Sequence, residues 1–362
     1  MHNIADLLLL MSVPGVGNFR VRNLVQRFGS PREVMEADVS TLRKVGHIDE
    51  KIARSIKQDV NHEFVEHQFS LADKLGVSIF SMWDEQYPDL LKKINDPPVL
   101  LFTRGEGHFN DKRSVAIVGM RGPSAYGRHM AELLGSMCAI QNITVISGMA
   151  RGIDTCAHEG ALASGGQTIA VLGCGVNVIY PPENDRLSER IMQHGLLISE
   201  FPLDLEPAPG HFPKRNRIIS GLSLGTVVIE AGEKSGALIT AYMALEQGRE
   251  VFALPGQVGY KGSRGPHQLI KEGAKLIESI EDIIDELSDL QNGDLQTGRS
   301  RSLEVLSPVE KEIWTLLSDA PMHIDHIASE LNRSTSELLS HLLSMELKNC
   351  VSQLSGMKFV RQ

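Results

Sequence analysis

Most of this sequence predicts an α/β protein built around a doubly wound parallel sheet. From about residue 76 to residue 287, short apolar runs bounded by glycine alternate with segments long enough for helices. Uninterrupted apolar runs are typical of strands covered on both faces, as in a parallel sheet between two layers of helices. Outside this region the alternation stops, so we expect a smaller domain at each end of the chain.

The first expected domain covers residues 1–75 and is helical, with ten Lys and Arg balanced by ten Asp and Glu. The Val-Pro-Gly-Val-Gly sequence at residues 13–17 lies between two apolar-periodic stretches and resembles a helix-hairpin-helix (SAM-like) turn. Glycines in such a turn let backbone amides approach a nucleic-acid phosphate. Residues 44–48 resemble a second, degenerate hairpin. A helical pair that only packs explains the same pattern, and both interpretations stay open.

The central domain, residues 76–287, contains six apolar runs that predict strands. They are residues 115–118, 143–146, 168–172, 196–199, 226–229 and 250–254. Helices are expected between them, at residues 126–140, 153–163, 183–194 and 237–247. Two earlier runs, residues 77–80 and 99–102, are expected to add strands before this core. The result is an extended Rossmann-like sheet.

A polar stretch at residues 288–302 is expected to be a linker. Residues 303–362 then show three helical patterns and a short hairpin, which together predict a winged helix. This domain carries five basic and eight acidic residues, and its third helical pattern is not basic. A winged helix that grips duplex DNA usually has a basic recognition helix. We therefore expect a protein-interaction or regulatory module.

Composition limits the classes of partner. The formal net charge is −9 and the isoelectric point about 5.8, so any nucleic acid must bind at a local basic patch. No apolar run approaches the ~20 residues of a membrane span, and no secretory signal is visible, so we expect no membrane insertion. The four cysteines lack metal-site spacing and are expected to be reduced thiols in the cytoplasm.

The strongest local signal is a cluster of cations, Lys214, Arg215 and Arg217, with Asn216 among them. It follows Pro213, which favours the first turn of a helix. Free amides and the positive dipole end at a helix N-terminus suit a phosphate. A solvated basic turn is the other interpretation of this run.

Two glycine-rich turns also follow predicted strands, and they carry Arg121 and Arg151. The carboxyl ends of parallel strands meet at one edge of a sheet, where α/β proteins bind ligands. Small residues there let backbone amides form an anion-binding concavity. With the cation cluster, these turns predict a groove several phosphates long.

Three motifs resemble those of the DNA processing protein A (DprA/Smf) family. Residues 212–223 are similar to its Phe-Pro-x-Arg-Asn-Arg-Ile-Ile-x-Gly-Leu-Ser signature. Residues 119–127 resemble its Gly-Ser-Arg-x-x-Ser-x-Tyr-Gly loop, and residues 147–154 its Ser-Gly-x-Ala-x-Gly-Ile-Asp turn. One position departs: Met120 stands where the family has Ser, which removes a hydroxyl but keeps Arg121.

The resemblance implies a non-catalytic single-stranded-DNA-binding protein of natural transformation and recombination, which protects incoming strands and loads the RecA recombinase. It needs no cofactor and no metal. The DNA-binding residues implied are Gly119, Arg121, Ser124, Tyr126, Gly127, Gly148, Arg151, Phe212, Lys214, Arg215, Asn216 and Arg217. Phe212 or Tyr126 would offer a ring to a base, although Phe212 also fits a core anchor.

The resemblance further implies a homodimer formed through the late part of the Rossmann-like domain. Its candidate dimer or recombinase contacts are Leu245, Ile270 and Leu276. Each of them fits a core position equally well, and periodicity does not separate the two interpretations.

An enzyme is the alternative interpretation. No phosphate-binding P-loop, Gly-x-Ser-x-Gly elbow or His-Glu-x-x-His helix occurs, and His323 and His326 fit surface residues better than a metal pair. Gly225-Thr226 with Glu230 resembles the arrangement of nucleotide-monophosphate phosphoribohydrolases. Alternatively, Glu230 ends a buried strand and caps a helix or pairs with Arg217.

Overall fold

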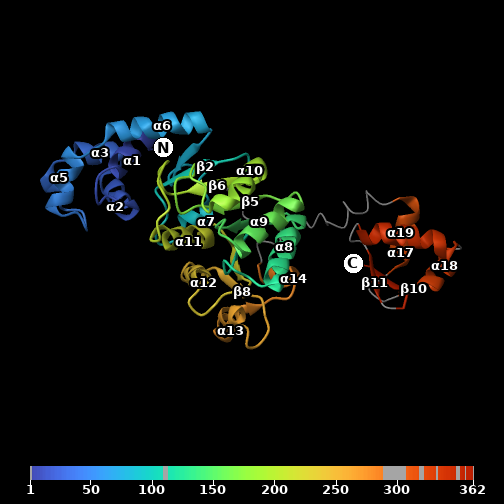
Figure 1. Ribbon diagram of the computed structural model, residues 1–362. Helices are drawn as coiled ribbons and strands as arrows, with labels where there is room; N and C mark the ends of the chain where they lie inside the picture. The colour runs from blue at the N-terminus through green and yellow to red at the C-terminus, as the bar shows by residue number, and fades with distance from the viewer. Residues whose placement is uncertain are drawn as a thin grey trace. The chain divides into compact units, whose positions relative to one another are not determined.

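The computed structural model describes residues 2–108, 113–287, 307–317, 322–331, 333–347, 351–354 and 356–361. It divides into two units, residues 1–292 and residues 293–362 (Figure 1). The predicted linker, residues 288–302, lies outside the described residues. The two units are therefore described separately.

The N-terminal part of the first unit is helical, as predicted. Its helices are α1 (Ile4–Met11), α2 (Asn18–Phe28), α3 (Pro31–Glu36), α4 (Val39–Leu42), α5 (Glu50–Gln58) and α6 (His62–Leu75). The turn between α1 and α2 needs glycine because Gly15 has a φ of +83°. Side-chain caps from Asn3, Asp49 and Asn61 begin α1, α5 and α6.

The first unit continues into a nine-stranded sheet in the order β1-β2-β6-β5-β4-β3-β7-β8-β9. The strands are β1 (Ser78–Ser81), β2 (Leu100–Arg104), β3 (Ser114–Val118), β4 (Thr144–Ser147), β5 (Thr168–Val171), β6 (Leu196–Ser199), β7 (Gly225–Val228), β8 (Glu250–Ala253) and β9 (Lys275–Leu276). Strands β3 to β9 are parallel, whereas β2 pairs antiparallel with both β1 and β6. The expectation of a parallel sheet is thus corrected at one edge, because an apolar run does not encode strand direction.

Helices cover both faces of this sheet (Figure 1). They are α7 (Asp89–Lys92), α8 (Ala125–Ile140), α9 (Ile153–Ala163), α10 (Asp185–His194), α11 (His211–Gly221), α12 (Gly236–Glu246), α13 (Arg264–Lys271) and α14 (Glu281–Glu286). Alternate residues of β3 point into different cores: Val115 and Ile117 pack with α8 and α9, while Ala116 and Val118 pack with α11 and α12. Burial on both faces explains why the strands are apolar throughout.

Strand order reverses between β3 and β7. From β3 the chain proceeds through β4 and β5 to β6 in one direction, and β7, β8 and β9 continue in the other. The loops after β3 and β7 therefore separate at the carboxyl edge of the sheet. Ligand sites of α/β proteins form at such a switch point.

The second unit is the predicted winged helix. It contains α17 (Pro308–Leu316), α18 (Ile324–Leu331) and α19 (Thr335–Leu347), with β10 (Met322–His323), β11 (Val351–Leu354) and β12 (Lys358–Arg361) in the order β10-β12-β11. Ser307 and Glu310 form the capping box that begins α17. The unit has its own core, which includes Ile313, Ile327 and Phe359.

Across the described residues, every helix is too short or too polar to cross a membrane.

Candidate nucleic-acid interface

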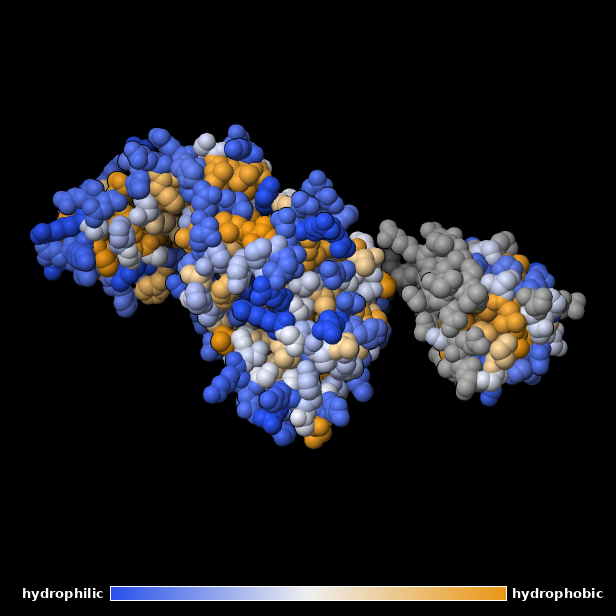
Figure 2. Space-filling view, viewed as in Figure 1, coloured by the Kyte–Doolittle hydropathy of each residue, from blue (hydrophilic) through white to orange (hydrophobic). Residues whose placement is uncertain are grey.

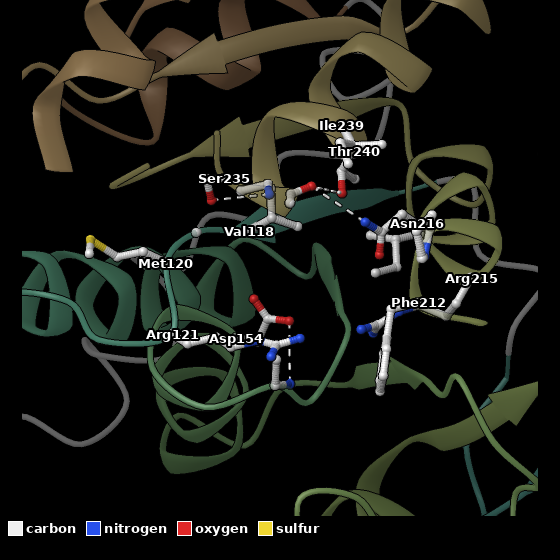
Figure 3. A pocket seen from close by; sticks show the side chains of 16 residues that line it. Val118, Met120, Arg121, Asp154, Phe212, Arg215, Asn216, Ser235, Ile239 and Thr240 are labelled. Carbon is white, nitrogen blue, oxygen red and sulfur yellow. Dashed lines mark hydrogen bonds between the residues drawn. The ribbon is translucent and has the colours of Figure 1, made fainter. Parts of the chain in front are cut away.

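A cavity of about 340 Å³ lies at the switch point, where β3 ends (Figure 3). Its wall contains Val118 and Arg121 from the end of β3, Phe212 and Asn216 from α11, and the first residues of α12. A smaller hollow shares Arg121 and Phe212 with this cavity and extends to Arg151 and Tyr180. The two hollows together form one surface, which we call the groove.

Three helix N-termini border the groove. Helix α11 begins at His211, α12 begins at Gly236 after its cap Ser235, and α9 begins at Ile153. Gly236 lines the cavity, as do Asp154 and Phe212 from the first turns of α9 and α11. Free amides and three positive dipole ends therefore face the same space, which favours an anion there.

Arg121 lines both hollows, and Lys214 follows Pro213, which lines the larger one. Both are exposed, and neither forms an ion pair with any residue that the structure describes. The Arg121 guanidinium lies 5.7 Å from the centre of the Phe212 ring. Arg151 is also exposed, but it forms an ion pair with Glu183. A phosphate would have to replace Glu183 as the partner of Arg151. In Figure 2 a strongly hydrophilic area, coloured deep blue, lies beside α11.

Arg215 lines both hollows of the groove, although most of its side chain is buried. Its side chain is 5% exposed, and its Nη1 donates to the carbonyl oxygen of Val171 at 2.7 Å. A Cβ at Gly148 would lie 1.7 Å from the same nitrogen, so only glycine fits above the guanidinium. Gly148 thus allows Arg215 to pack beneath the turn after β4, and a phosphate contact of Arg215 stays a prediction.

Asp154 shares this buried layer with Arg215. Its carboxylate accepts hydrogen bonds from the amides of Gly148 and Ala150 at 3.1 and 3.3 Å. Burial raises the pKa of Asp154, while Arg215 and the two amides oppose that rise. Burial likewise lowers the pKa of Arg215, against the effect of Asp154. The pair therefore holds the turn after β4 in shape from beneath.

Arg217 also points away from the groove. Its side chain is 12% exposed, its Nη2 donates to Glu200 at 2.5 Å, and its Nε lies 3.4 Å from Asp96. The expected phosphate contact of Arg217 is thus corrected to an internal ion pair. The alternative pairing of Arg217 with Glu230 is wrong as well, since Glu200 and Asp96 are its partners.

Ser124, Gly127 and Glu230 form a turn beside the groove. Ser124 caps α8 by accepting from the Gly127 amide at 3.0 Å, and its hydroxyl donates to Glu230 at 2.5 Å. The amide of Ser124 donates to the same carboxylate at 2.9 Å. A Cβ at Gly127 would lie 2.5 Å from this carboxylate, which is why the position is glycine. These residues support the loop after β3 and are not on the groove wall.

Glu230 and Tyr126 line a second cavity of about 620 Å³ that is separate from the groove residues. Glu230 is 3% exposed, and the Tyr126 hydroxyl donates to the carbonyl of Pro255 at 3.4 Å. Tyr126 thus lies outside the two hollows with 48% of its surface exposed, and stacking of a base on its ring stays a prediction. Glu230 likewise lines the second cavity and neither hollow of the groove, and the phosphoribohydrolase alternative stays a hypothesis.

The remaining motif residues occupy the groove edge. Phe212 is half-buried, with its ring 5.6 Å from that of Tyr180, so it serves both as an anchor and as a partly open face. Gly119 allows close approach of α9, because a Cβ there would lie 2.4 Å from Ile153. The Met120 sulfur lies 4.0 Å from the Tyr260 hydroxyl. Asn216 lines the cavity and donates to the carbonyl of Gly236 at 3.4 Å.

An apolar stripe on α12 was not predicted in full from the sequence. Leu245 is 51% exposed, and Ile239 and Tyr242 on the same face are 43% and 37% exposed. Leu276 on β9 is 42% exposed, whereas Ile270 is half-buried against the core of the sheet. Leu245 and Leu276 are thus surface residues, not core. The spacing of three residues along α12 was the sequence signal that would have added Ile239 and Tyr242 to the candidate contacts beside Leu245.

The histidine pair of the winged helix shows ordinary surface contacts. His323 lies 3.4 Å from Asp325, both being exposed. The described residues contain no group of three or more metal-ligating side chains.

Comparisons with known families cover all three domains. Residues 78–288 match the model of DNA recombination-mediator protein A, residues 298–357 match the DprA winged helix domain, and residues 7–61 match a SAM-like helix-hairpin-helix tandem. The matched boundaries follow the domains seen in the structure.

Curated relatives and solved structures agree with these models. The chain is 41% identical to Protein Smf of Escherichia coli over 75% of this chain and 74% of that protein. It is 45% identical to DNA processing protein DprA of Bacillus subtilis over 59% of this chain and 72% of that one. The structure of DNA processing protein A from Streptococcus pneumoniae superposes with a TM-score of 0.71 and 34% identity, covering 80% of this chain and 99% of that one.

A second solved structure is that of DNA processing protein A from Helicobacter pylori, described for its single-stranded DNA binding mode. It matches with a TM-score of 0.53 and 31% identity, over 58% of this chain and 95% of that chain. The family model alone spans more than half of the sequence. Fold, domain order and sequence identity together show that the chain belongs to the DNA recombination-mediator protein A family.

Proposed function

We propose that this protein binds single-stranded DNA along the groove and has no catalytic activity of its own. The observation that carries the proposal is the placement of Arg121, an exposed cation without a described ion pair, on the wall of a groove bordered by three helix N-termini. Lys214, which is also exposed and without a described ion pair, follows Pro213 of that wall. The chain as a whole is acidic, with a formal net charge of −9, so this cluster of free cations is a local feature. Its partner is a phosphate-bearing strand.

The character of the groove favours a single strand without sequence readout. Its anion-binding groups are cations and backbone amides, which contact phosphates and do not distinguish bases. The partly open ring of Phe212, with the Arg121 guanidinium above it, offers a base a stacking face. A base is available for such stacking only where the strand is unpaired.

The wider role proposed is protection of incoming strands in natural transformation and recombination, with loading of the RecA recombinase in the cytoplasm. Family membership supports it, since the matched model describes a recombination mediator. The exposed stripe of α12, formed by Ile239, Tyr242 and Leu245, supports a protein-protein contact. We assign this stripe, with Leu276, to a homodimer or recombinase interface, because exposed apolar patches of this kind usually bind proteins.

The groove is tested by salt-dependent binding. Labelled oligo-thymidine is titrated with the wild type and with Arg121→Ala, Lys214→Ala and the double variant, and fluorescence anisotropy is followed at several salt concentrations. Each single variant should bind more weakly, and its salt slope should be smaller by about 0.7 for each phosphate that the substituted side chain no longer neutralises. Arg190→Ala, an exposed cation of α10 away from the groove, is the matched control. Unchanged affinity and slope in a folded double variant would falsify the proposal.

A further inference from the structure

A polar cluster with a buried carboxylate at its centre connects the N-terminal helical domain to α11. It consists of Asn18, Arg22, Asp96, Glu200 and Arg217, which we call the Glu200 cluster. Asn18 donates to the Glu200 carboxylate at 2.7 Å, and Arg217 donates to the same oxygen at 2.5 Å. Arg22 lies 2.8 Å from Asp96, whose other oxygen lies 3.4 Å from Arg217.

Two residues of one helix face supply the N-terminal side of the cluster. Asn18 and Arg22 are four residues apart on α2, so their side chains project from the same face. Asn18 also accepts from the amide of Val99 at 3.0 Å, and Arg22 donates to the carbonyl of Pro97 at 2.6 Å. Helix α2 is thereby fixed against the segment that enters β2 and against the end of β6.

The cluster is costly to disturb because its buried carboxylate and its buried guanidinium depend on very few hydrogen bonds. Glu200 is 7% exposed, and its Oε1 has no hydrogen-bond partner among the described residues. The Nη1 atom of Arg217 is buried without a described partner as well. Burial raises the pKa of Glu200, and Arg217 and Asn18 oppose that rise by stabilising the carboxylate. A hydrogen bond to a buried charge is worth more than one between neutral groups.

The ion pairs of Arg217 fix α11 against the rest of the domain. Glu200 and Asp96 hold the Arg217 guanidinium on the helix whose Phe212 and Asn216 line the groove. If the cluster loosened, α11 would shift, and Phe212 and Asn216 would move with it. Neither of these side chains is charged, so their displacement weakens binding while the salt slope is retained.

We infer that Asn18 and Arg22 are positioning residues for the groove: the N-terminal hairpin domain supports single-strand binding by fixing α11 through the Glu200 cluster, without contacting DNA. Asn18, at the hairpin end of α2, donates to Glu200 and accepts from the amide of Val99. Its side chain is therefore engaged within the protein, whereas a DNA-contacting hairpin would present it to a phosphate. This inference rests on the proposed function of the groove. It favours the packing interpretation of residues 13–17 over direct contact with DNA.

The salt slope separates positioning from contact. A residue that touches phosphate lowers both affinity and slope when it is removed, whereas a positioning residue lowers affinity while the slope is retained. We expect Asn18→Ala and Arg22→Met to weaken binding of labelled oligo-thymidine by about tenfold, the equivalent of 1.4 kcal/mol. Their salt slopes should equal that of the wild type. Arg22→Lys, which keeps a charge beside Asp96, should recover part of the loss.

Two controls complete the experiment. Arg27→Ala removes an exposed cation from the same helix and should change neither affinity nor slope. Amide hydrogen exchange on the full-length protein should show faster exchange in α11 for Asn18→Ala than for Arg27→Ala. Circular dichroism establishes that each variant is folded before titration, and Asn18→Ser replaces Asn18→Ala if the latter does not fold.

The outcomes are distinct. Wild-type affinity in folded Asn18 and Arg22 variants overturns the inference, provided that Arg121→Ala still loses affinity and slope. A reduced slope in Arg22→Met also overturns it, because that result shows direct phosphate contact by the N-terminal domain. Failure of the wild type itself to bind the strand in a salt-dependent manner refutes the proposed function instead.

Discussion

Arg215 provides the sharpest test of how the basic motif is divided between binding and support. It lies between Lys214 and Asn216 in the sequence, yet it is 5% exposed and interacts with Asp154 and with the carbonyl of Val171. Arg215→Met keeps most of the side-chain length and removes the charge. Arg215→Met should therefore lower the free energy of unfolding, whereas Lys214→Met should weaken the binding of single-stranded DNA.

The expected cost follows from the groups that the change leaves behind. Asp154 would remain buried without its cation, and the Val171 carbonyl would lose a donor at 2.7 Å. The loss of a hydrogen bond made by a buried charged group costs about 1.5–3 kcal/mol, and the uncompensated charge of Asp154 adds to it. Typical proteins have only roughly 5–15 kcal/mol of folding free energy. We expect the melting temperature to fall by on the order of 10 °C.

The loss of stability in Arg215→Met should depend on pH. Without Arg215, the pKa of Asp154 rises further above its ordinary value of 3.8, since Arg215 is the largest influence that lowers it. A carboxyl whose folded pKa is raised binds protons more tightly in the folded state, so the folded state gains stability as pH falls through that pKa. The difference between Arg215→Met and the wild type should be largest near neutral pH. It should shrink as the pH falls toward 3.8.

Urea unfolding followed by far-ultraviolet circular dichroism measures the effect, at neutral pH and at a mildly acidic pH. Lys214→Met is the matched control, because substitution of this exposed neighbour should change stability by no more than about 0.5 kcal/mol. The reasoning would be refuted by an Arg215→Met protein as stable as the control whose salt slope for single-strand binding had fallen. That result would put Arg215 on a phosphate.

Three other changes test separate parts of the molecule. Glu230→Gln should leave strand binding largely intact, because Glu230 holds the Ser124 turn outside the groove; release of base from a nucleoside monophosphate by the wild type, abolished in this variant, would support the enzyme alternative. A chain ending at Leu287 should keep its single-strand affinity, as all groove residues precede that point; a tenfold loss, about 1.4 kcal/mol, would show that the winged helix takes part in binding. Leu245→Asp, at a 51% exposed site, should leave the fold unchanged and lower the mass seen by light scattering if α12 forms the dimer; an unchanged mass for a dimeric wild type would place the interface elsewhere.

The sequence by itself determined the order of domains and the location of the site. Apolar runs bounded by glycine identified eight of the strands to within a residue or two, because burial on both faces leaves an uninterrupted apolar signal. The glycine-rich turns follow the ends of β3 and β4, and that placement predicted that they lie at one edge of the sheet. The direction of β1 and β2 left no such signal, since an apolar run is the same in either orientation.

Only the tertiary structure decided which of the clustered cations face solvent. Lys214, Arg215 and Arg217 fall within four positions of one helix, and successive residues on a helix point about 100° apart. Lys214 is exposed, while Arg217 pairs with Glu200 and Asp96, and Arg215 donates to the carbonyl of Val171 and is stabilised by the charge of Asp154. These partners lie far away in sequence. The charge of a residue is local, but its partner depends on the packing of distant segments, so the motif predicted a site without showing which of its arginines support it from within.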